Sequence, residues 1–302
     1  MASFSHETVE KVGAILNNSS HPLAERFRAL FTLKGIGTPE AITQISRAFT
    51  DTSALLKHEC AYCLGQIRHS FAISKLEVVL RDISQESMVR HEAAEALGAI
   101  GDPSVCPTLE EYVNDSAKEV AETCQIALDR IKWLHDKDNE TFEDNNPYNS
   151  VDPAPPIANG SIEEWKVCLN DSSLPLFPRY RAMFALRNHG GQDAVLALVS
   201  GFLDHSALFK HELAYILGQM KDCNAIPALM ERLNDKSENS MVRHECAEAL
   251  GSIATEQCLE ILEQFKNDTE RVVKESCDVA IDMYHYENSE DFQYANAVDS
   301  TQ

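Results

Sequence analysis

The feature that most restricts the fold of this chain is a tandem duplication. Segments of the first half recur 153 residues later without a gap. Lys57–Gln66, with the sequence KHECAYCLGQ, aligns with Lys210–Gln219, with the sequence KHELAYILGQ. Met88–Glu92 meets Met241–Glu245, and both read MVRHE. The two halves are therefore expected to adopt the same fold, built from smaller repeated units.

Each half contains a shorter period of about 31 to 33 residues, the length of a helical hairpin. Apolar residues recur at helical spacing, and no long alternating strand pattern competes with them. Pro or Asx signals mark several helix starts, as at Thr38-Pro39 and Asp102-Pro103. We interpret four glycines near the ends of the second helices as helix stops: Gly65, Gly98, Gly218 and Gly251. The predicted fold class is all-α, with two duplicated halves of four hairpins each forming a superhelical solenoid.

The composition changes between the halves. Residues 136–160, DKDNETFEDNNPYNSVDPAPPIANG, are acidic, rich in Asn and Pro, and lack a helical apolar stripe. The predicted organisation is an N-terminal half at 1–135, an acidic linker at 136–160, a C-terminal half at 161–285 and a flexible tail at 286–302.

A His-Glu dipeptide recurs at equivalent positions of this duplicated pattern. Within each half the two pairs are 33 residues apart, and corresponding pairs of the two halves are 153 residues apart. In the flanking repeats the same place is aligned with Arg26-Phe27 or Arg179-Tyr180, and with Glu122-Thr123 or Glu275-Ser276. The dipeptide is therefore not a structural requirement of the repeat. The four pairs are His58-Glu59, His91-Glu92, His211-Glu212 and His244-Glu245.

This pattern predicts a metal site. Adjacent helices pack 8–10 Å apart, so side chains at equivalent positions of neighbouring second helices can converge on one ion. If the halves face each other, two half-sites would oppose. Imidazole and carboxylate without thiolate argue against structural zinc and iron–sulfur clusters, and two His with one carboxylate suit non-haem Fe(II) and dioxygen. Zinc or manganese with a hydrolytic role uses similar ligands.

Simpler interpretations compete with this one. A single His-Glu pair on a helix is usually solvated, or its Glu pairs with a nearby Lys or Arg. Cys60 and Cys63 form a C-x-x-C, but Leu213 and Ile216 replace them in the second half, so packing is favoured over redox chemistry. Tyr62 and Tyr215, each four residues after a His, are expected on the same face as those histidines, as packing or hydrogen-bonding groups.

Charge and hydropathy restrict the partners. A net charge of −22 argues against nucleic acid or an anionic membrane and favours a cationic partner. No apolar run is long enough to span a membrane. The first residues lack the basic and apolar regions of a signal peptide, so a cytoplasmic location is expected.

The segment Val89–Gly98, VRHEAAEALG, resembles HEAT repeats, and the duplicated His-Glu motifs KHECAYCLGQ, MVRHEAAEALG, KHELAYILGQ and MVRHECAEALG resemble the deoxyhypusine hydroxylase family. The resemblance covers residues 1–285. It implies a di-iron monooxygenase that uses dioxygen to hydroxylate deoxyhypusine on a translation factor, forming hypusine, and we expect a monomer.

Carried over by position, the resemblance assigns His58, His91 and Glu92 to one iron and His211, His244 and Glu245 to the other. Glu59 and Glu212 would contact the substrate's amines or lie around the metal ligands. All four glutamates share one local pattern, so their roles stay open at this stage. A dinuclear hydrolase and a metal-free HEAT adaptor remain the alternatives.

Overall fold

The computed structural model describes residues 4–136 and 146–289, and every structural statement below concerns these residues. They form α-helices joined by turns and short 3-10 segments, without a strand. The chain divides into two compact units, one up to Ile131 and one from Lys132 to Ser289. The predicted all-α class is confirmed.

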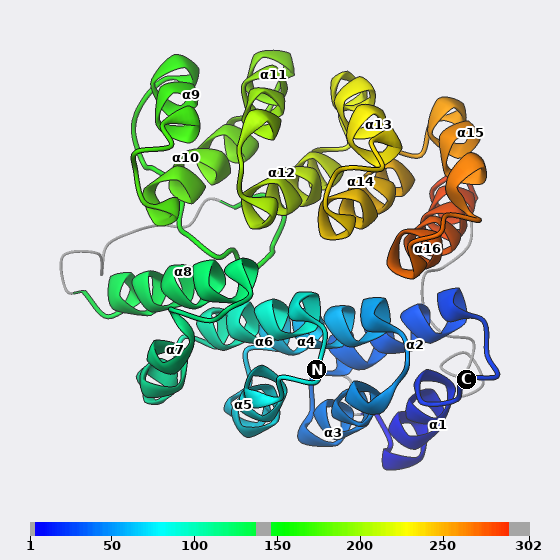
Figure 1. Cartoon of the computed structure of the whole chain (residues 1–302). Helices are drawn as coiled ribbons and strands as arrows, with labels where there is room; N and C mark the ends of the chain where they lie inside the picture. The colour runs from blue at the N-terminus through cyan, green and yellow to red at the C-terminus, as the bar shows by residue number, and fades with distance from the viewer. Residues whose placement is uncertain (1–3, 137–145, 290–302) are drawn as a thin grey trace. The chain divides into compact units, whose positions relative to one another are not determined.

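The first unit contains four helical hairpins (Figure 1). In each hairpin the first helix belongs to one row of helices, and the second helix packs beside the second helices of neighbouring repeats. The last helix ends three residues beyond the boundary of the unit. The hairpins are α1(His6–Leu16) with α2(Leu23–Ile36), α3(Pro39–Arg47) with α4(Ala54–Ile67), α5(Ile73–Arg81) with α6(Ser87–Ile100), and α7(Cys106–Tyr112) with α8(Lys118–Leu134).

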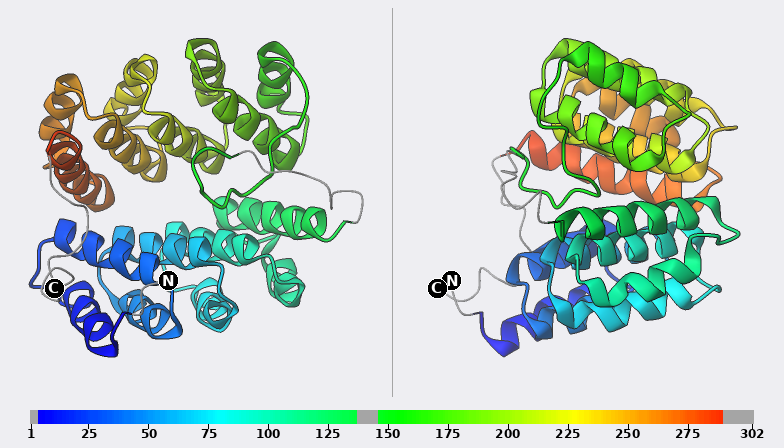
Figure 2. Two further views of the ribbon diagram at one scale, coloured as in Figure 1. Left: turned by 180° about the vertical axis from the view of Figure 1, so that it is seen from behind. Right: turned by 90° about the vertical axis from the view of Figure 1, so that its left-hand side faces the viewer.

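The second unit repeats this arrangement, and Figure 2 shows its two rows of helices from other directions. The final helix ends at Glu287, two residues beyond the predicted end of the C-terminal half. Of the predicted tail, residues 290–302 lie outside the described residues. The hairpins are α9(Ile162–Asn170) with α10(Leu176–His189), α11(Gln192–Ser200) with α12(Ala207–Met220), α13(Ile226–Asn234) with α14(Ser240–Ile253), and α15(Glu256–Phe265) with α16(Arg271–Glu287).

A buried arginine joins successive repeats. Arg90 Nε donates to the Leu80 carbonyl, 2.9 Å away, and its Nη2 lies 2.6 Å from Asp115 Oδ2. The two partners lie ten residues before and 25 residues after the arginine. Three further arginines make the same pair of contacts at the same spacings: Arg26 with Leu16 and Asp51, Arg179 with Leu169 and Asp204, and Arg243 with Leu233 and Asp268. Since each arginine reaches a carbonyl and a carboxylate from different segments, it fixes how one hairpin sits on the next.

The interpretation of Gly65, Gly98, Gly218 and Gly251 as helix stops is wrong. Each helix continues for two residues beyond its glycine, and the left-handed cap follows three residues after it, at Arg68, Gly101, Lys221 and Ala254. The four glycines instead face a neighbouring helix. A Cβ added at Gly65 would lie 2.8 Å from the Cα of Ala96. A Cβ added at Gly98, Gly218 or Gly251 would lie similarly close to Ala127, Ala249 or Ala280, respectively. They are glycine because neighbouring second helices approach one another there.

Part of the predicted linker is folded onto the second unit. Asp152 is buried and forms two hydrogen bonds with the fully buried guanidinium of Arg187, at 2.9 and 2.5 Å. Asn146 also donates to Asp152, and the Ile157 amide donates to the Arg181 carbonyl. We call residues 146–157 the strap. Residues 137–145 of the predicted linker lie outside the described residues, and the predicted domain limits stay a prediction.

Candidate metal centre

The first unit brings together His58 of α4 with His91 and Glu92 of α6. The two rings lie 5.4 Å apart between centroids, and His58 Nε2 is 3.3 Å from Glu92 Oε2. One ligand atom from each residue lies within 4.8 Å of the others. The contact of Gly65 with Ala96 holds α4 and α6 close enough for these side chains to meet. We call these three residues the first half-site.

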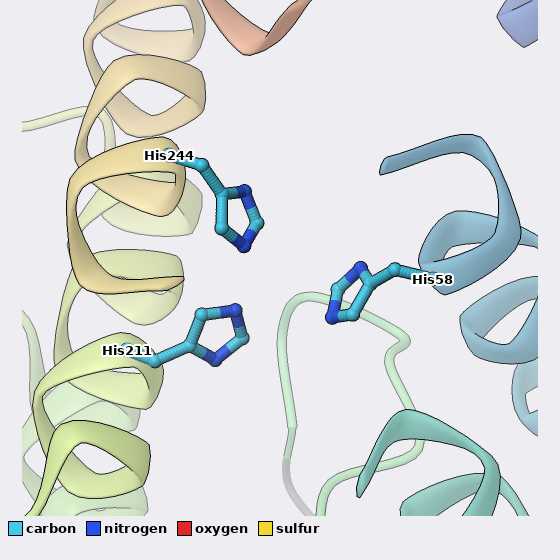
Figure 3. A group of neighbouring side chains, drawn as sticks. All are labelled: His58, His211 and His244. Atoms are coloured by element: carbon cyan, nitrogen blue, oxygen red, sulfur yellow. The ribbon is translucent and has the colours of Figure 1, made fainter. Parts of the chain in front are cut away.

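The second unit contains an equivalent group on α12 and α14. The rings of His211 and His244 lie 5.3 Å apart, and His211 Nε2 is 3.3 Å from Glu245 Oε2. Figure 3 shows both rings projecting from the same side of α12 and α14; it also labels His58, which projects from α4 of the first unit. We call His211, His244 and Glu245 the second half-site. The two half-sites agree in geometry although their residues lie 153 positions apart.

All eight residues of the four His-Glu pairs are buried, with exposures from 0 to 8%. This burial contradicts the interpretation of the pairs as solvated groups on a helix surface. A buried carboxylate costs free energy unless a partner compensates its charge. The four imidazoles and four carboxylates buried at equivalent positions are therefore expected to have partners that compensate their polarity and charge.

Glu59 and Glu212 follow the first histidine of each unit, on α4 and α12. They are 8% and 3% exposed. Glu92 and Glu245, by contrast, are the carboxylates that face His58 and His211 across the helix pair. The geometry thus identifies Glu92 and Glu245 as carboxylates beside a histidine of the neighbouring helix, which the shared sequence pattern could not do.

The half-sites fit a divalent metal ion. Neutral imidazole and carboxylate are ordinary ligands of iron, zinc and manganese. Thiolates are not expected as metal ligands here. Burial, assisted by the charge of Glu59, raises the pKa of the Cys60 and Cys63 thiols well above the usual range, which keeps them protonated. Both cysteines are fully buried. The assignment of individual metal ligands stays a prediction.

The alignment predicted from the sequence for the flanking repeats is wrong by one residue in the first repeat of each half. Arg26 makes the same contacts as Arg90, so the residue equivalent to His91 is Phe27. The same comparison of Arg179 with Arg243 places Tyr180 opposite His244. Residue types at one helix position could not reveal this shift, because the register depends on contacts with distant segments.

Glu248 lies on α14, one turn after His244. Glu248 Oε1 lies 3.4 Å from His244 Nδ1, and Ser276 Oγ of α16 donates to the same carboxylate oxygen at 2.9 Å. The sequence aligns Ser276 with the His-Glu place of the inner repeats and predicts no contact for it. The phenol of Tyr215, expected on the face of His211, accepts a hydrogen bond from Gln219 at 3.0 Å.

Comparison with known proteins agrees with the fold. A family model described as HEAT repeats matches residues 72–129 and 203–281, and one described as PBS lyase HEAT-like repeat matches residues 178–204. Deoxyhypusine hydroxylase of Drosophila melanogaster is 57% identical over 295 residues, covering 97% of both chains. The human protein of that name is 54% identical over 293 residues, covering 97% of this chain and 96% of its own.

This chain belongs to the deoxyhypusine hydroxylase family. A solved structure of human deoxyhypusine hydroxylase in complex with glycerol matches 93% of this chain and 96% of its own, with a TM-score of 0.90 and 54% identity. The predicted family, the HEAT-like fold and the predicted enzyme class are confirmed. Among the described helices, none has the length and apolar character needed to cross a membrane.

Proposed function

We propose that this chain hydroxylates the deoxyhypusine side chain of a protein substrate, a translation factor, using two iron ions and dioxygen, and so forms hypusine. The observation that carries the proposal is the pair of matched half-sites, each with two buried histidines and one facing glutamate, in a chain of the deoxyhypusine hydroxylase family.

The proposed ligands follow from these contacts. His58, His91 and Glu92 would hold one iron, and His211, His244 and Glu245 the other. Each set leaves coordination positions open, which is the arrangement that non-haem iron uses with dioxygen. Bound iron would supply the reduction of dioxygen that oxidation of an unactivated C–H bond requires.

We assign Glu59 and Glu212 to the substrate. Deoxyhypusine carries two amines, and the four buried glutamates exceed the two that the ligand sets use. A buried ammonium needs a carboxylate partner, and each of these two glutamates lies beside the first histidine of its unit. An ammonium group bound by Glu59 or by Glu212 would lie beside the histidine that precedes that glutamate, and so beside a proposed metal ligand of the same unit. The net charge of −22 favours a basic surface around the modified residue of the partner.

The decisive experiment uses iron-loaded, reduced protein and the deoxyhypusine form of the translation factor. The expected result is an added mass of one oxygen atom on the factor, taken from labelled dioxygen. Metal analysis of the same protein should give about two irons per chain, one for each half-site. Substrate that stays at its starting mass with fully loaded, reduced enzyme would contradict the proposal.

A hydrolase with two zinc or manganese ions is the second candidate, because the donor set suits these metals as well. Zinc-loaded protein should then be active without a reductant, whereas the hydroxylase requires iron and reducing equivalents. The cytoplasmic location and the monomeric state stay predictions from the sequence.

A further inference from the structure

We propose that Glu248 and Ser276 orient His244 and select Nε2 as its metal-binding nitrogen. This inference rests on the proposed role of His244 as a metal ligand. It concerns positioning residues, which would act through His244 and not on the substrate.

The three side chains contact one another inside the second unit. Glu248 Oε1 and Ser276 Oγ each lie 3.4 Å from His244 Nδ1, and Ser276 Oγ lies 2.9 Å from Glu248 Oε1. His244 and Ser276 are completely buried, and the Glu248 side chain is 16% exposed. The 3.4 Å contacts are at the long end for hydrogen bonds, and the 2.9 Å contact is a normal one.

The hydrogen-bond donors around Nδ1 indicate which nitrogen of His244 carries a proton. A serine hydroxyl has a single hydrogen, and Ser276 gives it to the Glu248 carboxylate, which can only accept. Towards His244, both neighbours are then acceptors. The ring satisfies them when Nδ1 carries the proton, which leaves the lone pair of Nε2 for a metal ion.

Such an arrangement is a general way to fix a metal-binding histidine. A carboxylate that accepts from the second ring nitrogen sets the tautomer, limits rotation of the ring and makes the other nitrogen a better donor. Glu248 lies on the same helix as His244, whereas Ser276 comes from the next repeat. The last hairpin, which lacks the His-Glu pair, thus contributes to the second half-site through a supporting residue.

The first unit carries Glu95 and Thr123 at the corresponding positions. The Thr123 hydroxyl, also buried, donates to the Glu119 carbonyl of its own helix at 2.8 Å. Its single proton is therefore directed to the backbone, whereas that of Ser276 is directed to a carboxylate. For this reason the proposal is limited to the second half-site.

The test uses the full chain with Co²⁺ as a spectroscopic probe, in wild type, Glu248→Gln, Glu248→Ala and Ser276→Ala. Removal of a carboxylate that accepts a hydrogen bond from a metal-binding histidine lowers metal affinity roughly 10- to 100-fold. We expect Glu248→Ala to weaken one of two Co²⁺ sites by about that factor and to change its visible absorption. Glu248→Gln keeps a hydrogen-bond acceptor and should therefore retain part of the Co²⁺ affinity. Ser276→Ala should reduce the Co²⁺ affinity less than Glu248→Ala does.

Glu25→Gln is the matched control, because Glu25 pairs with His21 at the same four-residue spacing but on an exposed surface. It should leave both Co²⁺ sites unchanged. In metal-free wild type, ring ¹⁵N chemical shifts should show His244 with the proton on Nδ1. A proton on Nε2, or two full-affinity Co²⁺ sites in a folded Glu248→Ala variant, would overturn the inference. Wild type that binds no metal would instead contradict the proposed function.

Discussion

Gly65 of α4 and Ala96 of α6 are in backbone contact: a Cβ at residue 65 would lie 2.8 Å from the Ala96 Cα. Gly218 and Ala249 have the same relationship in the second unit, at 2.9 Å. In each unit the glycine lies on the helix of the first histidine, two turns further along it. The contact therefore sets the spacing of the two helices that carry a half-site.

The first prediction concerns this contact. Gly65→Ala should destabilise the protein by about 1–3 kcal/mol, because the added methyl group meets backbone that cannot rotate away. It should also weaken metal binding at the first half-site, since α4 and α6 must separate. Thermal unfolding and Co²⁺ titration measure the two effects.

Gly35→Ala is the control for that variant. A Cβ at Gly35 has no atom within 4 Å, and the residue lies in the last turn of α2. The substitution should be neutral or stabilise the protein by up to about 1 kcal/mol. Equal losses of stability in both variants would show that the Ala96 contact is not the cause.

The second prediction separates the two kinds of glutamate. His91→Ala should lose about half of the bound iron or more, because it removes a ligand of one of two ions. Glu59→Ala should retain its iron and lose the ability to bind substrate. His244→Ala and Glu212→Ala should behave in the same way in the second unit. Iron content of purified variants is the measurement, and the same loss in His91→Ala and Glu59→Ala would refute the six-ligand assignment.

The third prediction concerns the strap. Asp152→Asn leaves the Arg187 guanidinium buried without its charge partner, a change that costs about 3–5 kcal/mol when a buried pair is broken. Release of the strap would limit that cost, so amide exchange of residues 146–157 should rise more than exchange in α14. Hydrogen exchange with mass analysis measures both segments.

Glu263→Gln provides the comparison for the strap, because Glu263 pairs with Lys266 on an exposed surface. This substitution should change the free energy of unfolding by less than about 1 kcal/mol. If Asp152→Asn were equally harmless and left exchange of the strap unaltered, the ion pair would not be what holds the strap in place.

The fourth prediction is a dependence of stability on pH. The hydrogen bond from Arg90 lowers the pKa of Asp115 below its ordinary value. Since the unfolded state then binds the proton more readily, Asp115 stabilises the fold above its unfolded pKa of about 3.9. That contribution is lost as the pH falls through the lower, folded value. Asp115→Asn should therefore flatten the acid side of the curve of unfolding free energy against pH.

Asp278 is expected to have the opposite effect, because burial raises its pKa. Its contribution is present below the unfolded pKa and is lost as the pH rises through the folded value. Asp278→Asn should therefore increase stability near neutral pH relative to acid. If both substitutions changed the pH dependence of the unfolding free energy in the same direction, the opposite pKa shifts assigned to Asp115 and Asp278 would be contradicted.

The sequence by itself determined the repeated features of the protein. Helical periodicity and the 153-residue offset predict eight hairpins, since each hairpin is specified by its own apolar pattern. The His-Glu pairs at equivalent positions indicate a shared site, and their motifs indicate the family. These features can be read locally because each depends on residues within one or two helical turns.

Only the tertiary structure decided how the hairpins meet. It shows that Gly65 is a close-contact residue and not a helix stop, and that Phe27 rather than Arg26 aligns with His91. It also places Glu92 opposite His58, Ser276 behind His244, and Asp152 against Arg187. In each case the partners are tens of residues apart, and a one-residue shift turns a helical side chain by roughly 100°. Packing between distant segments fixes that rotation, which the pattern of one helix leaves undetermined.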